Sequence, residues 1–164
     1  MKELLVIRHA KSSWTNAFQS DFERPLNDRG HRDAPVMAER TMKRGIAIQC
    51  FASSTANRAL TTAVYFAEAY GKNKKDILLF PELYHAPEET FYHVIEKLPD
   101  NCNSIALFSH NPGITDFVNG LTNTRIDNMP TCGIFAIKIE IDKWNLFREG
   151  EKKFWFFDYP KLDL

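Results

Sequence analysis

The chain has 164 residues, a length typical of a single domain with one sizeable core. Its formal net charge is zero, which excludes a strongly basic protein that binds nucleic acid or a membrane surface through its overall charge. No apolar run approaches the roughly 20 residues that cross a bilayer. The three cysteines, Cys50, Cys102 and Cys132, are far apart and lack paired spacing. We therefore expect one domain over residues 1–164, with reduced thiols and a cytoplasmic location.

The first predicted element is a buried strand over residues 4–7, which has the sequence Leu-Leu-Val-Ile. It leads directly to Arg8 and His9, and ligands bind at the carboxyl ends of strands in open α/β sheets. A guanidinium binds an anion through paired hydrogen bonds, and an imidazole is largely neutral and nucleophilic near pH 7. The pair fits a histidine that attacks phosphorus, and it equally fits a strand end with structural roles only.

Strand and helix patterns alternate along the rest of the chain. Residues 11–27 predict a polar and aromatic loop, followed by a helix that Asn27 caps and Gly45 ends. The later strands are expected at 46–52, 77–80, 104–109, 134–141 (alternating, with one exposed face) and 154–157, and the later helices at 57–71, 87–98 and 114–121. This alternation predicts an α/β three-layer sandwich, in which a mainly parallel sheet of about six strands carries helices on both faces.

Three of the predicted strands end in residues of similar chemistry. The first ends at Arg8 and His9, the second at Ser54 with Arg58 one helical turn further, and the fourth at His110. The carboxyl ends of parallel strands share one edge of the sheet, so two arginines and two histidines are expected to converge there. The start of the helix that carries Arg58 also offers free backbone N–H groups, which favour an anion. The sequence therefore predicts a phosphate pocket.

Phosphoryl transfer requires mainly positioning and positive charge around the phosphoryl oxygens. Arg8 and Arg58 supply fixed charges, and His110 supplies further hydrogen bonds. His9 would attack through one ring nitrogen while the other bonds a backbone carbonyl, and nearby arginines should lower the pKa of His9 and keep it neutral. We expect a phosphohistidine intermediate that water then hydrolyses.

Residues 8–12, Arg-His-Ala-Lys-Ser, resemble the Arg-His-Gly signature of the histidine phosphatase (phosphoglycerate mutase-like) superfamily, in the form of its SixA-type phosphohistidine phosphatase branch. The resemblance continues, in the expected order, at 21–30, 53–59, 83–86, 110–113 and 127–131. It spans most of the chain. It implies a phosphoglycerate mutase-like fold and a phosphatase that uses no metal and no other cofactor.

The resemblance also implies roles for individual residues. His9 is the nucleophile that becomes phosphorylated, and Arg8, Arg58 and His110 complete the catalytic pocket. The general acid of this family is usually a carboxylate after the third strand, which implies Glu82 here. This last assignment is the least specific, because a phosphohistidine needs less help from an acid than a phosphoester does.

Three further residues are expected to contact the substrate. Ser12 and Asn111 would assist the phosphate pocket, and His85 lies in a loop that borders it. The chain is short between Arg58 and His110, where larger members of the family carry insertions that cover a small substrate. We therefore expect an open pocket that accepts a protruding group, such as a phosphohistidine on a signalling protein.

Two other functions are kept as alternatives. The same chemistry could act on a small phosphoester or phosphoanhydride, or the chain could be a phosphate- or phosphopeptide-binding module without turnover. The presence of Arg8, His9, Arg58 and His110 argues against the module. The expected partner is thus a phosphorylated protein or a small phosphorylated molecule, and neither nucleic acid nor a membrane. The oligomeric state is left open, and the histidines lack the spacing of a zinc site.

Overall fold

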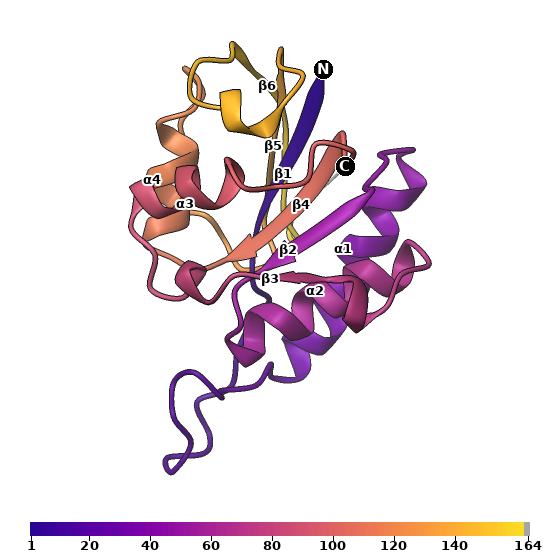
Figure 1. The fold of residues 1–164 in the computed structure, drawn as a ribbon. Helices are drawn as coiled ribbons and strands as arrows, with labels where there is room; N and C mark the ends of the chain where they lie inside the picture. Colours follow the sequence, from indigo (N-terminus) through magenta and orange to yellow (C-terminus); the bar gives the residue numbers. More distant parts are fainter. Residues whose placement is uncertain (163–164) are drawn as a thin grey trace.

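The computed structural model describes residues 1–162 (Figure 1). Its strands are β1 (Lys2–Arg8), β2 (Cys50–Ser53), β3 (Leu78–Leu79), β4 (Ser104–Ser109), β5 (Ile134–Ile139) and β6 (Lys152–Asp158). Its α-helices are α1 (Asp28–Lys43), α2 (Asn57–Ala69), α3 (Glu88–Ile95) and α4 (Gly113–Asn119), and its short 3-10 helices are η1 (Lys74–Asp76), η2 (Pro81–Leu83) and η3 (Trp144–Leu146). No helix within residues 1–162 is long and apolar enough to span a membrane.

The strands form one six-stranded sheet with the order β3-β2-β4-β1-β5-β6. β1 and β2 both run parallel to β4, and β3 runs parallel to β2, whereas β5 is antiparallel to β1 and to β6. Arg8 is paired in register with Ser109, and Ser53 with Phe108. The carboxyl ends of β1, β2 and β4 therefore meet at one edge of the sheet, and the predicted mainly parallel sheet is confirmed.

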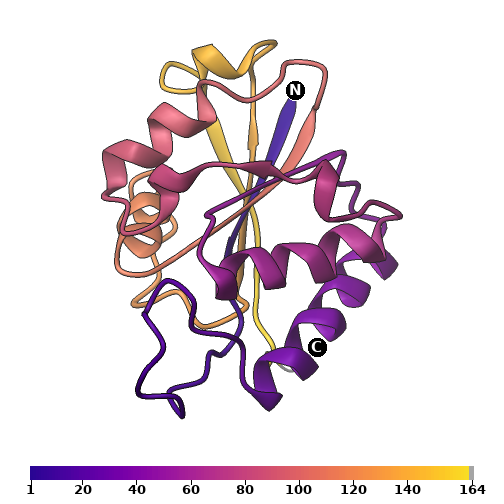
Figure 2. The same cartoon turned by 60° about the horizontal axis from the view of Figure 1, so that its bottom comes forward.

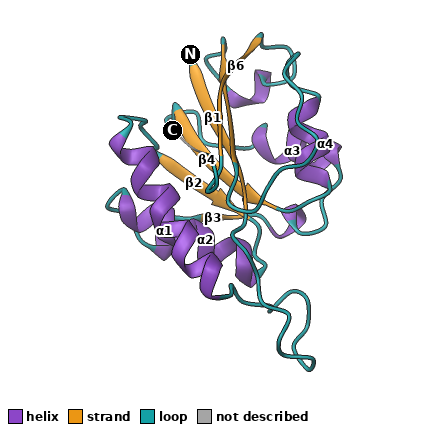
Figure 3. Cartoon of the chain, turned by 180° about the vertical axis from the view of Figure 1, so that it is seen from behind, coloured by secondary structure: helices purple, strands orange, loops and turns teal. Residues whose placement is uncertain are grey.

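The side chains of β1 alternate between two buried cores. Leu4 and Val6 pack in a core with residues of α3 and α4, whereas Leu5 and Ile7 pack in a second core with residues of α1 and α2. Figures 2 and 3 show the same division, with α1 and α2 on one face of the sheet and α3 and α4 on the other. A strand covered on both faces is apolar at every position, which explains the continuous run in β1 and confirms the three-layer sandwich.

The segment over residues 11–27 leaves the sheet as a loop that protrudes from the body of the molecule (Figure 1). Its end is fixed at α1, where the side chain of Asn27 accepts a hydrogen bond from the Gly30 N–H at 2.9 Å, as the sequence predicts for an N-cap. The Lys11 carbonyl accepts a hydrogen bond from the Asn27 N–H at 3.0 Å. A Cβ at residue 30 would collide with that carbonyl, so the glycine allows the two ends of the loop to approach closely.

The predicted strand over 46–52 is wrong in its first half. β2 begins only at Cys50, which is paired with Ile105 of β4. Because β4 itself begins at Ser104, it offers hardly any backbone with which earlier residues could pair. Residues 46 and 48 are nevertheless buried. Their apolar side chains alternate because they pack on the core, although this segment is not a strand of the sheet.

The exposed face predicted for the strand over 134–141 is also wrong. β5 lies between β1 and β6, and five of its six residues are buried. Ile134 and Ala136 face the α1 and α2 side, while Phe135 and Ile137 face the α3 and α4 side. Position 138, a lysine, suggests an exposed face in the sequence, yet it is half-buried in the structure.

The expectation of three reduced thiols is wrong for two of the cysteines. Cys50 and Cys102 form a disulfide with a Cα–Cα distance of 6.1 Å, while Cys132 is free and buried. Cys50 is the first residue of β2, and Cys102 lies just before the neighbouring strand β4, so the pairing of these strands brings the sulfurs together. A separation of 52 residues hides this proximity in the sequence. The predicted cytoplasmic location loses the support that it drew from unpaired thiols.

Candidate active site

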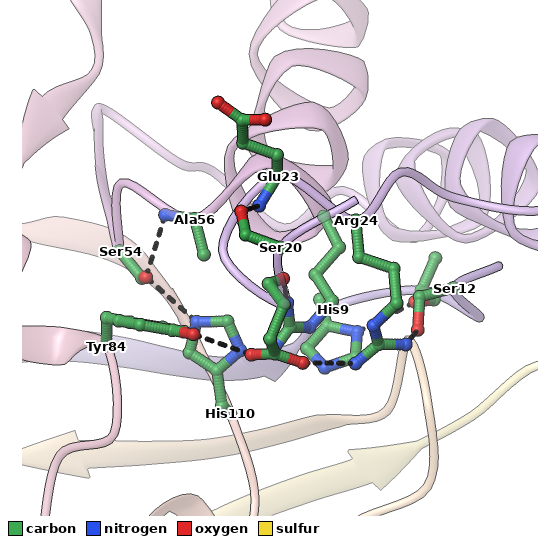
Figure 4. Close-up of polar contacts among 12 residues, drawn as sticks. His9, Ser12, Ser20, Glu23, Arg24, Ser54, Ala56, Tyr84 and His110 are labelled. Atoms are coloured by element: carbon green, nitrogen blue, oxygen red, sulfur yellow. Dashed lines mark hydrogen bonds and ion pairs between the residues drawn. The ribbon is translucent and has the colours of Figure 1, made fainter. Parts of the chain in front are cut away.

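The edge of the sheet where β1, β2 and β4 end carries the candidate site. His9 follows β1, Ser54 follows β2 and His110 follows β4. Because β4 lies between β1 and β2, the residues after these strands come together. The ring centroids of His9 and His110 are 5.1 Å apart. Figure 4 shows His110 and Tyr84 on one side of His9, and Arg24 and Ser12 on the other.

His9 is 6% exposed and holds a defined tautomer. Its Nδ1 lies 2.8 Å from the Ala10 carbonyl oxygen, and a carbonyl can only accept, so Nδ1 carries the proton and Nε2 has a free lone pair. Burial lowers the pKa of His9 to about 3, and the charges of Arg8, Arg58 and Arg24 act in the same direction. His9 is therefore a neutral imidazole at neutral pH, with an unprotonated Nε2.

The ring of His110 lies beside that of His9 and contacts the residue that follows β2. Its Nε2 lies 2.8 Å from Ser54 Oγ, and the same Oγ accepts a hydrogen bond from the Ala56 N–H at 3.2 Å. When the Ser54 hydroxyl donates its own hydrogen to Nε2, the proton of His110 resides on Nδ1, which is buried and has no partner in the described residues. Burial lowers the pKa of His110, and His9 and Arg58 lower it further. His110 is thus a neutral hydrogen-bond donor.

Four buried side-chain nitrogens have no hydrogen-bond partner within residues 1–162, and no other buried side-chain nitrogen or oxygen there shares this condition. They are Nε of Arg8, Nε of Arg24, Nε of Arg58 and Nδ1 of His110. An unsatisfied buried donor costs about 1–3 kcal/mol, so four around one histidine require an acceptor. An oxyanion supplies several acceptor oxygens together with the opposite charge.

Arg8 Nη1 and both Nη groups of Arg58 are held by protein acceptors. Arg8 Nη1 donates to the Met129 carbonyl at 2.8 Å. Arg58 Nη1 donates to the Asp21 carbonyl at 2.6 Å, and its Nη2 donates to Asp21 Oδ2 at 3.1 Å. These bonds fix the guanidinium planes while the Nε–H groups stay free. Arg58 is 5% exposed, so water does not compete for its charge.

Three residues of this cluster, Asp21, Arg24 and Tyr84, were not among the predicted site residues, and two of them lie in the loop over 11–27. Arg24 Nη1 donates to Ser12 Oγ, Arg24 Nη2 donates to Asp21 Oδ1 at 3.1 Å, and the Tyr84 hydroxyl donates to Asp21 Oδ2 at 2.6 Å. The side chain of Arg24 is 11% exposed, and its guanidinium lies 3.5 Å from the centre of the Trp14 ring. Periodicity predicts strand ends and says nothing about the path of a loop, so only the loop's acidic and basic residues could have signalled this role.

Ser12 and Asn111 have their polar groups occupied by protein partners. Ser12 is buried, and its Oγ accepts the hydrogen bond from Arg24. The Asn111 amide donates to Asn128 Oδ1 at 3.0 Å and to the Met129 carbonyl at 3.1 Å. Met129 is also the partner of Arg8, so Asn111 supports the segment that holds this arginine.

Glu82 and His85 lie outside the cluster of unpartnered donors. Glu82 is exposed and pairs with Lys97 Nζ at 2.9 Å. The hydrogen bond from Lys97 lowers the pKa of Glu82, which weakens it as a general acid. His85 is exposed and has a φ of 57°, and its ring is tilted against that of Tyr84 with a centroid distance of 3.9 Å, so it lies on the Tyr84 side of the cluster.

A neutral histidine beside a second histidine and three arginines, at the carboxyl edge of an α/β sheet, is an arrangement suited to an oxyanion ligand. Residues 4–87 match the model of the histidine phosphatase superfamily (branch 1), and the chain belongs to this superfamily. The family predicted from the resemblance is confirmed, and its membership supports phosphatase activity.

Three solved structures place the fold among proteins of this kind. SixA from Agrobacterium tumefaciens is similar with a TM-score of 0.81 and 24% identity, over 97% of this chain and 98% of that chain. A protein histidine phosphatase SixA complexed with tungstate gives a TM-score of 0.81 and 19% identity, over 96% of this chain and 97% of that chain. A mycobacterial glucosyl-3-phosphoglycerate phosphatase gives a TM-score of 0.69 and 13% identity, over 94% of this chain and 97% of that chain. The predicted phosphoglycerate mutase-like fold is confirmed.

Proposed function

We propose that the chain is a metal-independent phosphatase that acts through a phosphohistidine on His9 and removes phosphoryl groups from phosphohistidine in a protein. The observation that carries the proposal is the set of four unpartnered buried N–H groups around one neutral, tautomerically defined histidine. A phosphoryl group supplies both the acceptor oxygens that these donors lack and the phosphorus that His9 would attack.

In the first step, the Nε2 lone pair of His9 forms a bond to phosphorus while the bond between phosphorus and the substrate nitrogen breaks. The electron pair of that bond goes to the leaving imidazole, which takes a proton from water. Arg8, Arg58 and His110 donate to the phosphoryl oxygens, where negative charge must be stabilised. An imidazole is a better leaving group than an alkoxide, so an ionised Glu82 fits this substrate better than it fits a phosphoester.

In the second step, water attacks the phosphorus of phospho-His9. The bond between phosphorus and Nε2 breaks, its electron pair returns to His9, and inorganic phosphate leaves. The attacking water loses one proton to the medium. Because the Nδ1–H of His9 stays bonded to the Ala10 carbonyl, the ring keeps its orientation and recovers the same tautomer for the next cycle.

The surface near the site supports a macromolecular substrate. Trp14 is 74% exposed and Phe18 is fully exposed, and both lie on the loop that also carries Arg24 and Asp21. Exposed aromatic side chains beside a polar site are typical of protein–protein contacts. A protruding phosphohistidine could enter the site while its protein packs on this loop.

Hydrolysis of small phosphoesters is the second candidate. The observation that favours it is the shared fold with the mycobacterial glucosyl-3-phosphoglycerate phosphatase. That likeness concerns the fold, so it does not decide the substrate. A comparison of rates on a phosphohistidine protein and on a panel of phosphoesters separates the two candidates, and the proposal expects the higher kcat/KM on the protein.

The test of activity itself is hydrolysis of p-nitrophenyl phosphate in the presence of EDTA. We expect turnover that EDTA does not reduce and that His9→Ala abolishes. Turnover would exclude a phosphate-binding module without catalysis. Equal turnover by His9→Ala would contradict the proposed mechanism, and loss of wild-type turnover in EDTA would contradict metal independence.

A further inference from the structure

Asp21 is placed between two of the arginines whose Nε atoms have no partner. Its three oxygens accept hydrogen bonds from Arg58 Nη1 and Nη2, from Arg24 Nη2 and from the Tyr84 hydroxyl. All the arginine donors that it engages are Nη groups, whereas the unpartnered donors of the same arginines are Nε groups. One residue therefore engages Nη groups of both guanidinium groups, while their buried Nε–H groups remain without a partner.

The backbone at Asp21 is held in place by the start of α2. The Asn57 N–H donates to the Phe22 carbonyl at 2.9 Å, and the Asn57 side-chain amide donates to the Glu23 carbonyl at 2.9 Å. Arg58 directly follows Asn57, and Asp21 directly precedes Phe22. The backbone hydrogen bond from Asn57 to Phe22 therefore lies next to the hydrogen bonds from Arg58 to Asp21. The loop is thereby tied to the helix that carries the catalytic arginine.

We propose that Asp21 is a positioning residue, which holds Arg58 and Arg24 by their Nη edges so that their Nε–H groups bind the phosphoryl group in the transition state. This inference rests on the proposed function and extends it to a residue outside the oxyanion pocket. Two guanidinium groups that converge on one anion repel each other, and a carboxylate between them reduces this repulsion. The hydrogen bond from Tyr84, together with those from Arg24 and Arg58, lowers the pKa of Asp21, so its carboxylate stays charged across the working pH range.

The alternative is that the Asp21 carboxylate has no positioning role and only repels the anionic substrate. A negative charge close to an anion site weakens anion binding by Coulomb repulsion, so its removal would then tighten binding. Positioning predicts the opposite sign, because free guanidinium groups lose their alignment when the carboxylate loses its charge. The sign of the change in oxyanion affinity thus separates the two roles of Asp21.

The experiment compares wild type with Asp21→Asn and uses two probes, vanadate, which mimics the five-coordinate transition state, and inorganic phosphate, which mimics the ground state. We expect the vanadate inhibition constant of Asp21→Asn to rise by about tenfold, which corresponds to about 1.4 kcal/mol, and the phosphate constant to rise less. kcat on p-nitrophenyl phosphate should fall, with KM little changed. Vanadate binding as tight as wild type, or tighter, would overturn the inference.

Two further variants keep the outcome interpretable. Glu23→Gln removes the same charge from the same loop. The Glu23 carboxylate makes no hydrogen bond or ion pair within residues 1–162 and points away from the cluster in Figure 4. This variant should bind vanadate as wild type does, within about twofold, because exposed charges are screened. Tyr84→Phe removes one hydrogen bond to Asp21 without a change of charge and should weaken vanadate binding in the same direction by a smaller factor. Unchanged vanadate binding in Tyr84→Phe would count against the network if Asp21→Asn fails to fold.

The same data separate this inference from the proposed function. A wild-type protein without turnover and without vanadate inhibition would overturn both. A wild-type protein with turnover and vanadate inhibition, together with an Asp21→Asn variant that binds vanadate at least as tightly, would overturn the inference alone.

Discussion

The imidazoles of His9 and His110 lie with their ring centroids 5.1 Å apart, and burial holds the pKa of each below its usual range. Two neighbouring neutral imidazoles can divide the chemistry of phosphoryl transfer between them. His9 presents an unprotonated Nε2, and His110 carries its proton on Nδ1 when the Ser54 hydroxyl donates to its Nε2. The proposed mechanism therefore assigns nucleophilic attack to one neutral histidine and oxyanion stabilisation to the other, without a charged histidine.

Replacement of His110 by Gln should remove the donor at the Nδ1 position, because the side-chain N–H groups of glutamine lie nearer the position of the histidine Nε2. By comparison with other lost oxyanion donors, we expect kcat to fall by about 10²- to 10³-fold. Steady-state kinetics on p-nitrophenyl phosphate measure the effect, and His93→Gln on the exposed face of α3 is the control. A loss of kcat no larger in His110→Gln than in His93→Gln would contradict the role of His110.

Replacement of Arg58 by Ala should cost about 3 kcal/mol of transition-state stabilisation, because a fixed charge and an Nε–H donor are lost together. Arg58→Lys should recover little of this loss, since lysine lacks the planar fork that Asp21 holds. The ratio of kcat/KM values between wild type and variant measures the cost. A reduction smaller than tenfold in Arg58→Ala would argue against the place assigned to Arg58.

The loop over 11–27, with its exposed Trp14 and Phe18, should affect kcat/KM on a protein substrate and not on a small one. We expect Phe18→Ser to lower kcat/KM by about fivefold or more on a phosphohistidine protein, in the range of an interface contact worth about 1 kcal/mol, and to leave p-nitrophenyl phosphate hydrolysis unchanged. Leu146→Ser is the matched control, because Leu146 is also exposed but lies in η3, away from this loop in Figure 1. Equal behaviour of the two variants on the protein substrate would refute a docking role for the loop.

The buried neutral histidines should make the protein less stable in acid. The pKa of His9 is lowered to about 3 in the folded protein and is about 6.5 in an unfolded chain. Between these values the unfolded state binds a proton that the folded state does not, so the free energy of unfolding falls as the pH falls, by about 1 kcal/mol per pH unit for each such histidine. Stability is thus greatest above pH 6.5 and declines towards pH 3.

Urea unfolding at pH 7, 6 and 5 measures this slope. The slope should be shallower in His9→Gln, because glutamine does not titrate, and His93→Gln should keep the slope of wild type. An identical slope in His9→Gln and wild type would show that His9 is not held neutral by the fold.

The sequence predicts the architecture well wherever strands are covered on both faces. The apolar runs in β1 and β4 identify buried strands directly, and the Asn27 cap and Gly45 mark the ends of α1. The strand prediction fails over residues 46–49, because a strand also needs a neighbouring strand with which to form hydrogen bonds. These residues alternate between buried and exposed positions, but no strand lies beside them along their length. The Cys50–Cys102 disulfide is missed for a related reason, since only the order of the strands brings the two residues together.

The site shows the same division between strand ends and loops. Arg8 ends β1, and His9 and His110 directly follow β1 and β4, so the parallel sheet alone predicts that they meet. The contributions of Asp21 and Arg24 depend on how a loop folds back onto α2, which periodicity does not encode. Nor does the sequence reveal that Lys97, a residue of the chain after α3, pairs with Glu82 and lowers its pKa.

The most direct measurement of the central claim is the identification of the phosphorylated residue during turnover. The reaction with a phosphorylated substrate is quenched in alkali, which preserves phosphohistidine, and the peptides are mapped by mass spectrometry. The account predicts a phosphoryl group on the peptide that contains His9, bonded to Nε2 and labile in acid. A phosphoryl group on any other residue of the enzyme would contradict it.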